Sequence, residues 1–194
     1  MPHRAVVPLL FAALLAACAA SPAQPPRNAI RIAPGLDLAL PWPSDLGRSL
    51  DATQLVTAHY GDQTMVFEGH ITATPAKFLL VVVDPLGRRA LSVTWTDAGI
   101  TYEAAPWLPP TVRPQNMLAD IVMLYWPEAV VRQALSGGRL IVTRGSRSVL
   151  MAGQEVIHAD YQPAAGGEIW AGVSRYRNLP WGYDLDIQSV LSTP

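Results

Sequence analysis

The stretch from Phe78 to Trp95, FLLVVVDPLGRRALSVTW, decides the fold. Its first six residues are all apolar, a pattern typical of a strand that is covered on both faces. Asp84–Gly87 has the composition of a tight turn, and after it apolar and polar side chains alternate up to Trp95, as in a strand with one buried face. Two strands that are joined by so short a turn pair antiparallel.

Similar strand patterns continue on both sides of this hairpin and are interrupted once, in the middle of the chain. There Met117, Ile121 and Tyr125 recur at the spacing of one helix face, and Pro127 suits the first turn of a second helix. We therefore predict an α+β domain, in which a single curled antiparallel sheet of about ten strands forms a half-barrel and two short helices cover its concave apolar face. The predicted strands are 54–60, 63–71, 77–83, 89–95, 99–104, 139–144, 148–152, 155–160, 168–173 and 182–190, and the predicted helices are 115–125 and 127–135.

The composition excludes two classes of protein. The 194 residues carry 14 basic and 15 acidic side chains, a net charge of −1, so the chain lacks the cationic field with which a nucleic-acid binder neutralises phosphates. The single cysteine has no partner for an intramolecular disulfide, so a disulfide-stapled scaffold is excluded as well.

The N-terminal segment has the organisation of a secretory signal. Arg4 precedes an apolar run of 13 residues, which is shorter than the roughly 20 residues that span a bilayer. The junction Leu15-Ala-Ala-Cys18 resembles the bacterial lipobox, in which the cysteine thiol receives a diacylglyceryl group. We therefore expect residues 1–17 to be removed and Cys18 to be lipidated. By the same resemblance, Ala19 after the cysteine implies anchoring to the outer membrane, facing the periplasm.

The segment after the cysteine is rich in proline. Residues 19–43 contain six prolines, which remove backbone donors and favour extended conformations. We predict that the acylated cysteine and a semi-rigid tether occupy residues 18–43, and that the folded domain occupies residues 44–194.

Motifs of the common hydrolases, nucleotide-binding proteins and zinc proteases are missing from the chain, so we expect neither an enzyme nor a cofactor or metal site. His70 and His158 lie two residues from Glu68 and Asp160, on the same strand faces. Such carboxylates can orient an imidazole for base or metal chemistry. Half-exposed histidines on ordinary strands give the same pattern, and we take this as the simpler interpretation.

Two further groups of charged residues leave alternatives open. Asp184 and Asp186 share one strand face, where they form either an acid–base pair or a solvated outer surface. Arg88-Arg89, and Arg144 with Arg147, flank two predicted turns. Their guanidinium groups either meet lipid phosphates or supply ordinary turn polarity.

The Phe78–Trp95 hairpin resembles the third and fourth strands of LolB-like outer-membrane lipoproteins, in which an apolar strand runs into Asn-Pro-Leu-Gly. The helical stretch 117–127 and the closing segment 182–187 are similar to LolB-like lipoproteins that are often encoded beside aryl-polyene synthesis genes. The resemblance implies a fold of the LolA/LolB type. It also implies membrane contact by the turn residues Pro85, Leu86 and Gly87, with the leucine protruding.

A curled sheet with helices on its inner face encloses an apolar region, which is either an open cavity or a filled core. We expect this region to bind acyl or other hydrophobic chains during lipid or lipoprotein transfer, with the protein held on the outer membrane through Cys18. The alternative is an envelope assembly accessory that docks a protein partner, for example in aryl-polyene lipid synthesis. The side chains expected to line a cavity are Phe78, Leu80, Val82, Leu91, Val93, Trp95, Leu118, Val122 and Trp126.

Overall fold

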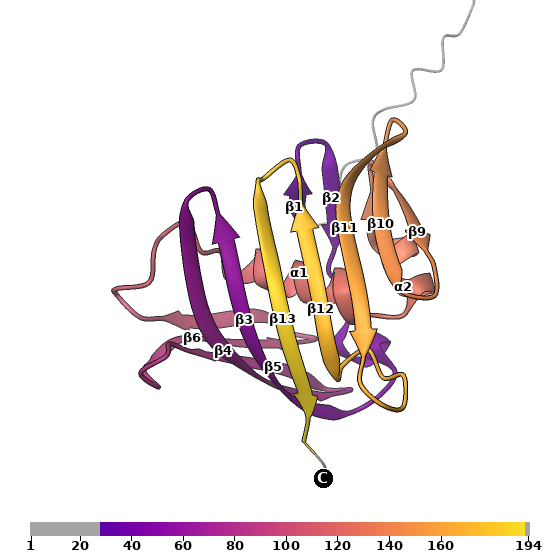
Figure 1. Cartoon of the computed structure of the whole chain (residues 1–194). Coiled ribbons are helices and arrows are strands. Elements are labelled where there is room, and N and C mark those ends of the chain that lie inside the picture. Colours follow the sequence, from indigo (N-terminus) through magenta and orange to yellow (C-terminus); the bar gives the residue numbers. More distant parts are fainter. Residues whose placement is uncertain (1–27, 193–194) are drawn as a thin grey trace, which may run out of the picture.

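The computed structural model describes residues 28–192, most of which form one strongly curled sheet (Figure 1). Ten strands pair antiparallel in the spatial order β7-β6-β5-β4-β3-β13-β12-β11-β10-β9. The predicted fold class is therefore confirmed. The strands are β3 (Leu50–Tyr60), β4 (Gln63–Thr74), β5 (Lys77–Val83), β6 (Arg89–Thr96), β7 (Gly99–Ala104), β9 (Arg139–Val142), β10 (Ser146–Met151), β11 (Gln154–Pro163), β12 (Gly172–Asn178) and β13 (Tyr183–Leu191).

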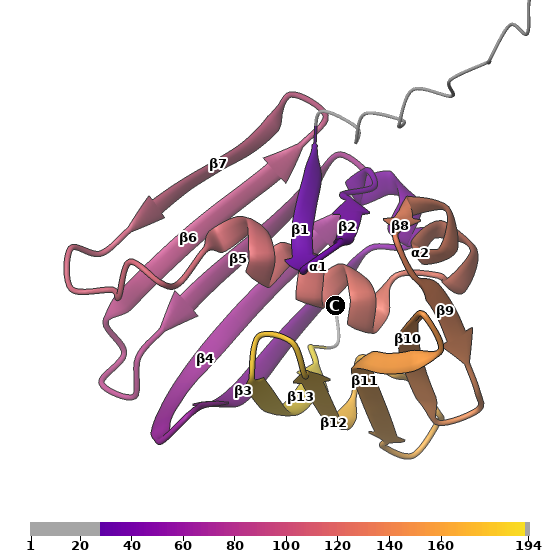
Figure 2. The same cartoon turned by 90° about the horizontal axis from the view of Figure 1, so that it is seen from above.

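The remaining elements lie on the inner side of this sheet. Helix α1 (Pro114–Tyr125) runs through the concave side, and α2 (Glu128–Ala134) follows it beside β9 (Figure 2). A small second sheet has the order β1-β2-β8 and packs over α1. Its strands are β1 (Ala29–Ala33), β2 (Leu36–Ala39) and β8 (Leu135–Ser136), and a short 3-10 helix, η1 (Pro43–Leu46), leads from it into β3.

The deciding hairpin, β5–β6, forms as predicted but is covered on one face only. Phe78, Leu80 and Val82 of β5 are buried against the helices, whereas Leu79 and Val81 on the other face are half-buried. No second layer covers the outer face within the described part of the chain. The apolar outer side chains instead lie between those of the neighbouring strands, where β-branched and aliphatic residues pack well on a pleated surface.

The predicted tether is wrong for the part of it that the structure describes. Residues 28–43 form the β1–β2 hairpin and the start of η1, and Ile32, Leu36 and Leu38 are fully buried. The Nδ2 group of Asn178, on β12, donates to the carbonyl of Ile32 at 2.8 Å. Apolar residues alternate with polar ones here, as in other strands, and the high proline content obscured that period. Residues 18–27 lie outside the described residues.

One strand was placed too early along the chain. We predicted a strand at 168–173, but β12 spans Gly172–Asn178. The inward positions of β12 include the polar side chains of Ser174 and Asn178, so its hydrophobic alternation is weak. Trp170, within the predicted range, lies in the loop before β12 and stacks on Tyr125 with ring centroids 4.2 Å apart. A loop residue thus supplies core packing that would normally come from a strand.

Candidate functional site

An open pocket of about 640 Å³ lies between the concave face of the sheet and helix α1. This volume falls in the range of about 300–1,000 Å³ that is typical of small-molecule sites. The walls come from β3, β4 and β13 on one side, from α1 on another, and from the loop that enters α1. Most of the lining is apolar, including Val56, Ala58, Met65, Phe67, Leu80, Val112, Met117, Ile121, Leu124, Leu185 and Ile187.

Side-chain size explains why the pocket lies on these strands. Ala58 of β3 and Gly69 of β4 both line it, and their small side chains leave space below α1. On the neighbouring strands, Phe78 of β5 pairs with Ala73 at the other end of β4 and with Trp95 of β6, and these two rings extend inwards and fill the space there. The pocket therefore begins where the large inward-facing rings end.

The predicted cavity lining was wrong for eight of its nine residues. Only Leu80 lines the pocket. The other eight do not line it, and at no more than 4% exposed they belong to the closely packed core. Three of the eight form an aromatic cluster in a closed core, with Trp126 centred 5.5 Å from Phe78 and 5.6 Å from Trp95. Of the two alternatives left open by the sequence, a filled core holds for this part of the molecule.

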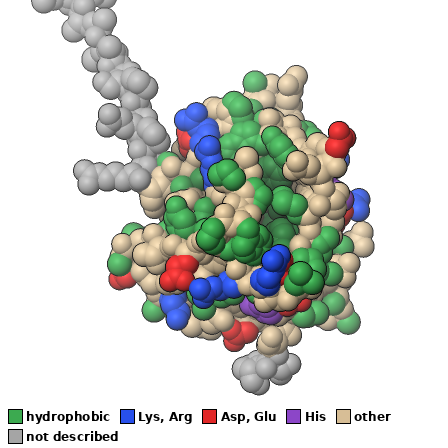
Figure 3. Space-filling view, turned by 90° about the vertical axis from the view of Figure 1, so that its left-hand side faces the viewer, with side chains coloured by type: hydrophobic (Ala, Val, Ile, Leu, Met, Phe, Trp, Pro, Cys, Tyr) green, Lys and Arg blue, Asp and Glu red, His purple; other side chains and the backbone are tan. Residues whose placement is uncertain are grey.

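The mouth of the pocket carries exposed apolar side chains. Tyr60 and Met65, from the β3–β4 hairpin, line the pocket and are 57% and 37% exposed. Trp181 and Pro109 add further apolar surface from the β12–β13 turn and the loop before α1. Figure 3 shows hydrophobic side chains gathered around the hollow on this side of the molecule, with a few basic groups at its edge. The pocket is thus open to an apolar molecule that approaches from this side.

One buried carboxyl group lies in the pocket wall. Asp120 projects from α1, and both of its carboxylate oxygens lie 2.8 Å from the hydroxyl of Tyr183, which donates to them. Burial raises the pKa of Asp120 to about 7, although the phenols of Tyr183 and Tyr176 oppose this shift. Sequence patterns did not predict this site, because a single aspartate on an apolar helix face has no recognisable motif.

The turn after β5 presents Leu86 to solvent, with 78% of the residue exposed. Asp84 shapes the turn, because its Oδ1 accepts hydrogen bonds from the backbone N–H groups of Leu86 and Arg88. These bonds and the ion pair with Arg88 hold the pKa of Asp84 below its usual value, against the effect of partial burial. Gly87 has φ +75°, which a glycine adopts without strain. The leucine therefore protrudes, as the resemblance implied.

Each histidine contacts carboxylates on the outer face of the sheet. His70 pairs with Glu68 at 2.9 Å, and His158 pairs with Asp160 at the same distance and with Glu155 at 3.0 Å. Hydrogen bonds to both carboxylates raise the pKa of His158, although partial burial works against them. Across residues 28–192, no three His, Cys, Asp or Glu residues are placed to hold a metal ion.

The other charged residues singled out in the sequence have structural partners. Asp186 pairs with Arg175 at 2.7 Å and with His59 at 3.5 Å, so the predicted outer surface describes it better than an acid–base pair with Asp184. Arg89 pairs with Glu103, and Arg147 donates to two carbonyls at the end of α1. Turn and core contacts therefore account for these two arginines.

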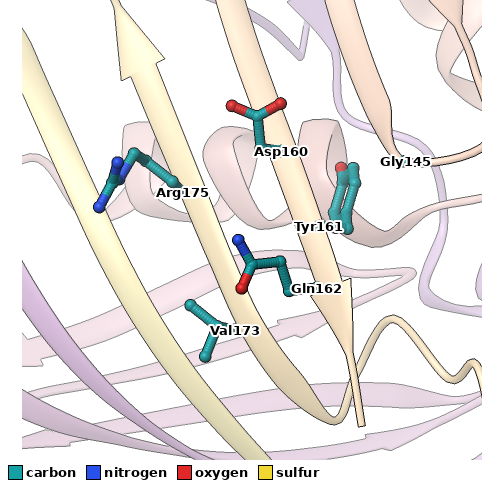
Figure 4. Close-up of a pocket in the computed structure, with 6 residues that line it drawn as sticks. All are labelled: Gly145, Asp160, Tyr161, Gln162, Val173 and Arg175. Atoms are coloured by element: carbon teal, nitrogen blue, oxygen red, sulfur yellow. The ribbon is translucent and has the colours of Figure 1, made fainter.

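A second, polar hollow of about 250 Å³ lies on β11 and β12 (Figure 4). Two of its polar side chains are already engaged, since Tyr161 donates to the carbonyl of Leu124 and Arg175 donates to Asp186. It is therefore a weaker candidate than the apolar pocket. Its lining residues are Gly145, Asp160, Tyr161, Gln162, Val173 and Arg175.

The family described as "Protein of unknown function (DUF3261)" matches residues 51–191, which is most of the chain. The chain belongs to this family. The match begins at the start of β3 and ends with β13, so it includes the large sheet, both α-helices and every residue that lines the apolar pocket. The N-terminal hairpin precedes the part of the chain that matches the DUF3261 family.

Two solved structures are similar to this DUF3261 protein. A LolA superfamily protein from Nitrosomonas europaea is 9% identical, with a TM-score of 0.46 over 73% of this chain and 84% of that chain. A DUF1329 family protein from Desulfovibrio piger is 7% identical, with a TM-score of 0.35 over 76% of this chain and 87% of that chain. Comparison with curated proteins gives no significant match. None of the helices within residues 28–192 is long and apolar enough to cross a membrane.

Proposed function

We propose that this protein is a lipid-anchored envelope protein without enzymatic activity, which binds one acyl or other hydrophobic chain in the pocket between α1 and strands β3, β4 and β13. The observation that carries the proposal is the apolar pocket of about 640 Å³ with an apolar mouth. Moving an apolar chain from water into such a site is favourable by about 0.8 kcal/mol for each buried methylene. Burial in the pocket is therefore enough to bind an apolar chain, and no chemical reaction is needed.

The anchor in this proposal is an acylated Cys18. Nine residues lie between Cys18 and Asn28, the first described residue. A chain of that length spans at most about 35 Å, because each residue extends at most ~3.6 Å. The folded domain would therefore stay close to the outer membrane, within reach of lipid or of acylated proteins. Acyl chains on one cysteine hold a protein on a bilayer without a transmembrane helix.

The Leu86 turn is the proposed point of contact with the bilayer during transfer. Its leucine is exposed, and the carboxylate of Asp84 is neutralised by Arg88 and engaged by backbone N–H groups. The guanidinium of Arg88 also lies 4.9 Å from the ring centroid of Trp107, which is itself half-exposed. An aliphatic tip beside an aromatic ring and a cation suits the interface between lipid headgroups and acyl chains.

Native mass spectrometry of the mature chain with Cys18→Ser tests chain binding. We expect co-purified lipid, and we expect added fatty acid to displace the neutral fluorophore N-phenylnaphthylamine. The variant Ala58→Phe should fill the pocket and lose both signals. Thr57→Phe is the matched control, because it adds the same ring to the opposite face of the same strand. A wild-type protein that carries no lipid and binds no probe would overturn the proposal and favour the assembly accessory.

The role of the turn is tested separately. Transfer of the bound fluorophore to vesicles of outer-membrane-like phospholipid should slow by at least about tenfold in Leu86→Glu, because a charged tip enters the bilayer poorly. Leu55→Glu is the control, since Leu55 is also exposed but lies on the outer face of β3. Equal transfer rates for wild type and Leu86→Glu would remove the turn from the mechanism and leave chain binding intact.

A further inference from the structure

The apolar pocket contains one buried carboxyl group whose hydrogen-bonding capacity is not filled. Asp120 is in the second turn of α1, between the pocket-lining residues Met117 and Ile121. Its distance from Arg113, at the start of the helix, is about 10 Å along the axis, because each helical residue rises ~1.5 Å. Arg113 also lines the pocket but is exposed, whereas Asp120 is buried, so the basic group lies at the edge of the pocket and the carboxyl group in its inner wall.

Two phenols face the carboxyl group of Asp120, and together they offer fewer donors than it has acceptor sites. Tyr183 donates to it, and the buried hydroxyl of Tyr176 is close enough to affect its pKa. Tyr183 has one hydroxyl proton and so makes one hydrogen bond at a time, although both carboxylate oxygens are within 2.8 Å of its oxygen. A carboxylate has about four lone-pair sites for hydrogen bonds. No lysine, arginine or histidine among residues 28–192 forms an ion pair with Asp120.

A buried acceptor without enough donors is costly, and a ligand that supplies a donor removes that cost. A ligand with its own negative charge at this position adds like-charge repulsion in a poorly solvated site. On these grounds we propose that the pocket selects amphiphiles whose polar end donates hydrogen bonds and carries no negative charge, such as an ammonium, hydroxyl or amide group, and that Asp120 is the group that recognises this end. The inference rests on the proposed binding of apolar chains.

A second buried polar group of the pocket wall, Gln54, fits this selection. Gln54 is fully engaged at its amide nitrogen, which donates to Tyr125 and to Ser189 at 3.0 Å each. It therefore has no free donor from that nitrogen for an anionic headgroup. Because burial raises the pKa of Asp120 to about 7, its carboxyl group is partly ionised at neutral pH, and a donor from the ligand stabilises the ionised form.

Three ligands that share one alkyl chain but differ in their polar end test this inference separately from the binding of the alkyl chain. Dodecylamine, dodecanol and dodecanoate are each used to displace N-phenylnaphthylamine from the mature chain with Cys18→Ser. We expect dodecylamine and dodecanol to bind at least about tenfold more tightly than dodecanoate, a difference of ~1.4 kcal/mol. If none of the three displaces the probe, the proposed function fails. If dodecanoate binds as well as the others, only the present inference fails.

The variant Asp120→Asn tests whether this residue causes the preference for dodecylamine over dodecanoate. The amide keeps the shape and an acceptor for Tyr183 but loses the charge, so the preference of dodecylamine over dodecanoate should fall to less than about threefold. Glu68→Gln is the matched control, because it removes the same charge from the outer face of β4. A full preference retained in Asp120→Asn would overturn the inference.

If circular dichroism shows that Asp120→Asn folds poorly, a second variant provides the test. Tyr183→Phe removes the hydroxyl that donates to Asp120 and leaves its carboxylate oxygens with fewer donors. Loss of the phenol raises the pKa of Asp120 further, so the comparison is made at about pH 9 to favour the ionised carboxylate, and the preference for dodecylamine over dodecanoate should then exceed that of the wild type. An unchanged or reversed preference would show that Asp120 does not contact the polar end of the ligand.

Discussion

The indole rings of Trp95 and Trp126 stack with centroids 5.6 Å apart and with an angle of 25° between their planes. Trp95 comes from β6 and Trp126 from the residue that ends α1, so this contact fixes the helix against one half of the sheet. The pocket lies under the same helix against the other half. One half of the concave face therefore anchors α1, and the other half is left free for a ligand.

Replacing Trp126 by alanine should strongly destabilise the fold. Trp126 is fully buried, and removing a buried large aromatic side chain typically costs about 3–5 kcal/mol. The measurement is urea unfolding followed by circular dichroism, where the loss would appear as a lower midpoint. Trp107→Ala is the control, because Trp107 is half-exposed, and it should cost less than about 1 kcal/mol. Equal effects of the two variants would contradict a closed core around Trp126.

Gly137→Ala should destabilise the domain far more than Gly153→Ala. Both glycines have positive φ, +90° and +84°, so both substitutions carry the cost of about 1–2 kcal/mol for a left-handed residue. At Gly137 an added Cβ would also lie 2.0 Å from the carbonyl oxygen of Gly35, whereas at Gly153 it meets open space. The difference between the two variants measures how much the packing of the β1–β2 hairpin contributes to the stability of the domain. Similar unfolding midpoints would show that the hairpin is loosely attached.

Arg147→Met should cost more stability than Arg175→Met. The Nη1 group of Arg147 donates to the carbonyls of Met123 at 3.1 Å and of Trp126 at 2.7 Å, which lie at the C-terminal end of α1. Hydrogen bonds to a charged group contribute about 1.5–3 kcal/mol, and methionine keeps much of the apolar stem. Arg175 makes only a surface ion pair with Asp186, which is worth about 0–1 kcal/mol. A larger loss for Arg175→Met in urea unfolding would contradict this assignment.

Hydrophobic periodicity predicted most of the sheet because most inward positions are apolar. It missed β12, where Ser174 and Asn178 face inwards, and the β1–β2 hairpin, where prolines at the ends masked the alternation. The pocket was misplaced for a different reason. Side-chain volume decides whether an apolar face is filled, and Ala58 and Gly69 are as compatible with a strand core as the larger residues are. Hydrophobicity alone does not distinguish a core from a cavity.

Asp120 should give the stability a pH dependence that Asp120→Asn lacks. Desolvation raises the pKa of this carboxyl group from 3.8 to about 7 in the folded state, against the opposing phenols of Tyr183 and Tyr176. Between these two values the folded state binds more protons than the unfolded state, so the free energy of unfolding contributed by Asp120 falls as the pH rises. At ~1.4 kcal/mol for each pH unit, the wild type should lose up to about 4 kcal/mol relative to the variant.

Urea unfolding of both proteins between about pH 4 and pH 8 measures this difference, since asparagine does not titrate in that range. The wild type and Asp120→Asn should be closest in stability at the acidic end and should diverge towards neutral pH, with the variant more stable there. Asp84→Asn is a control of opposite sign, because the pKa of Asp84 is lowered in the folded state. Its stabilising contribution is present above the ordinary aspartate pKa and is lost as the pH falls. Parallel curves for the wild type and Asp120→Asn would show that the carboxyl group is solvated, and the pocket would then lack the desolvated acceptor on which ligand selection depends.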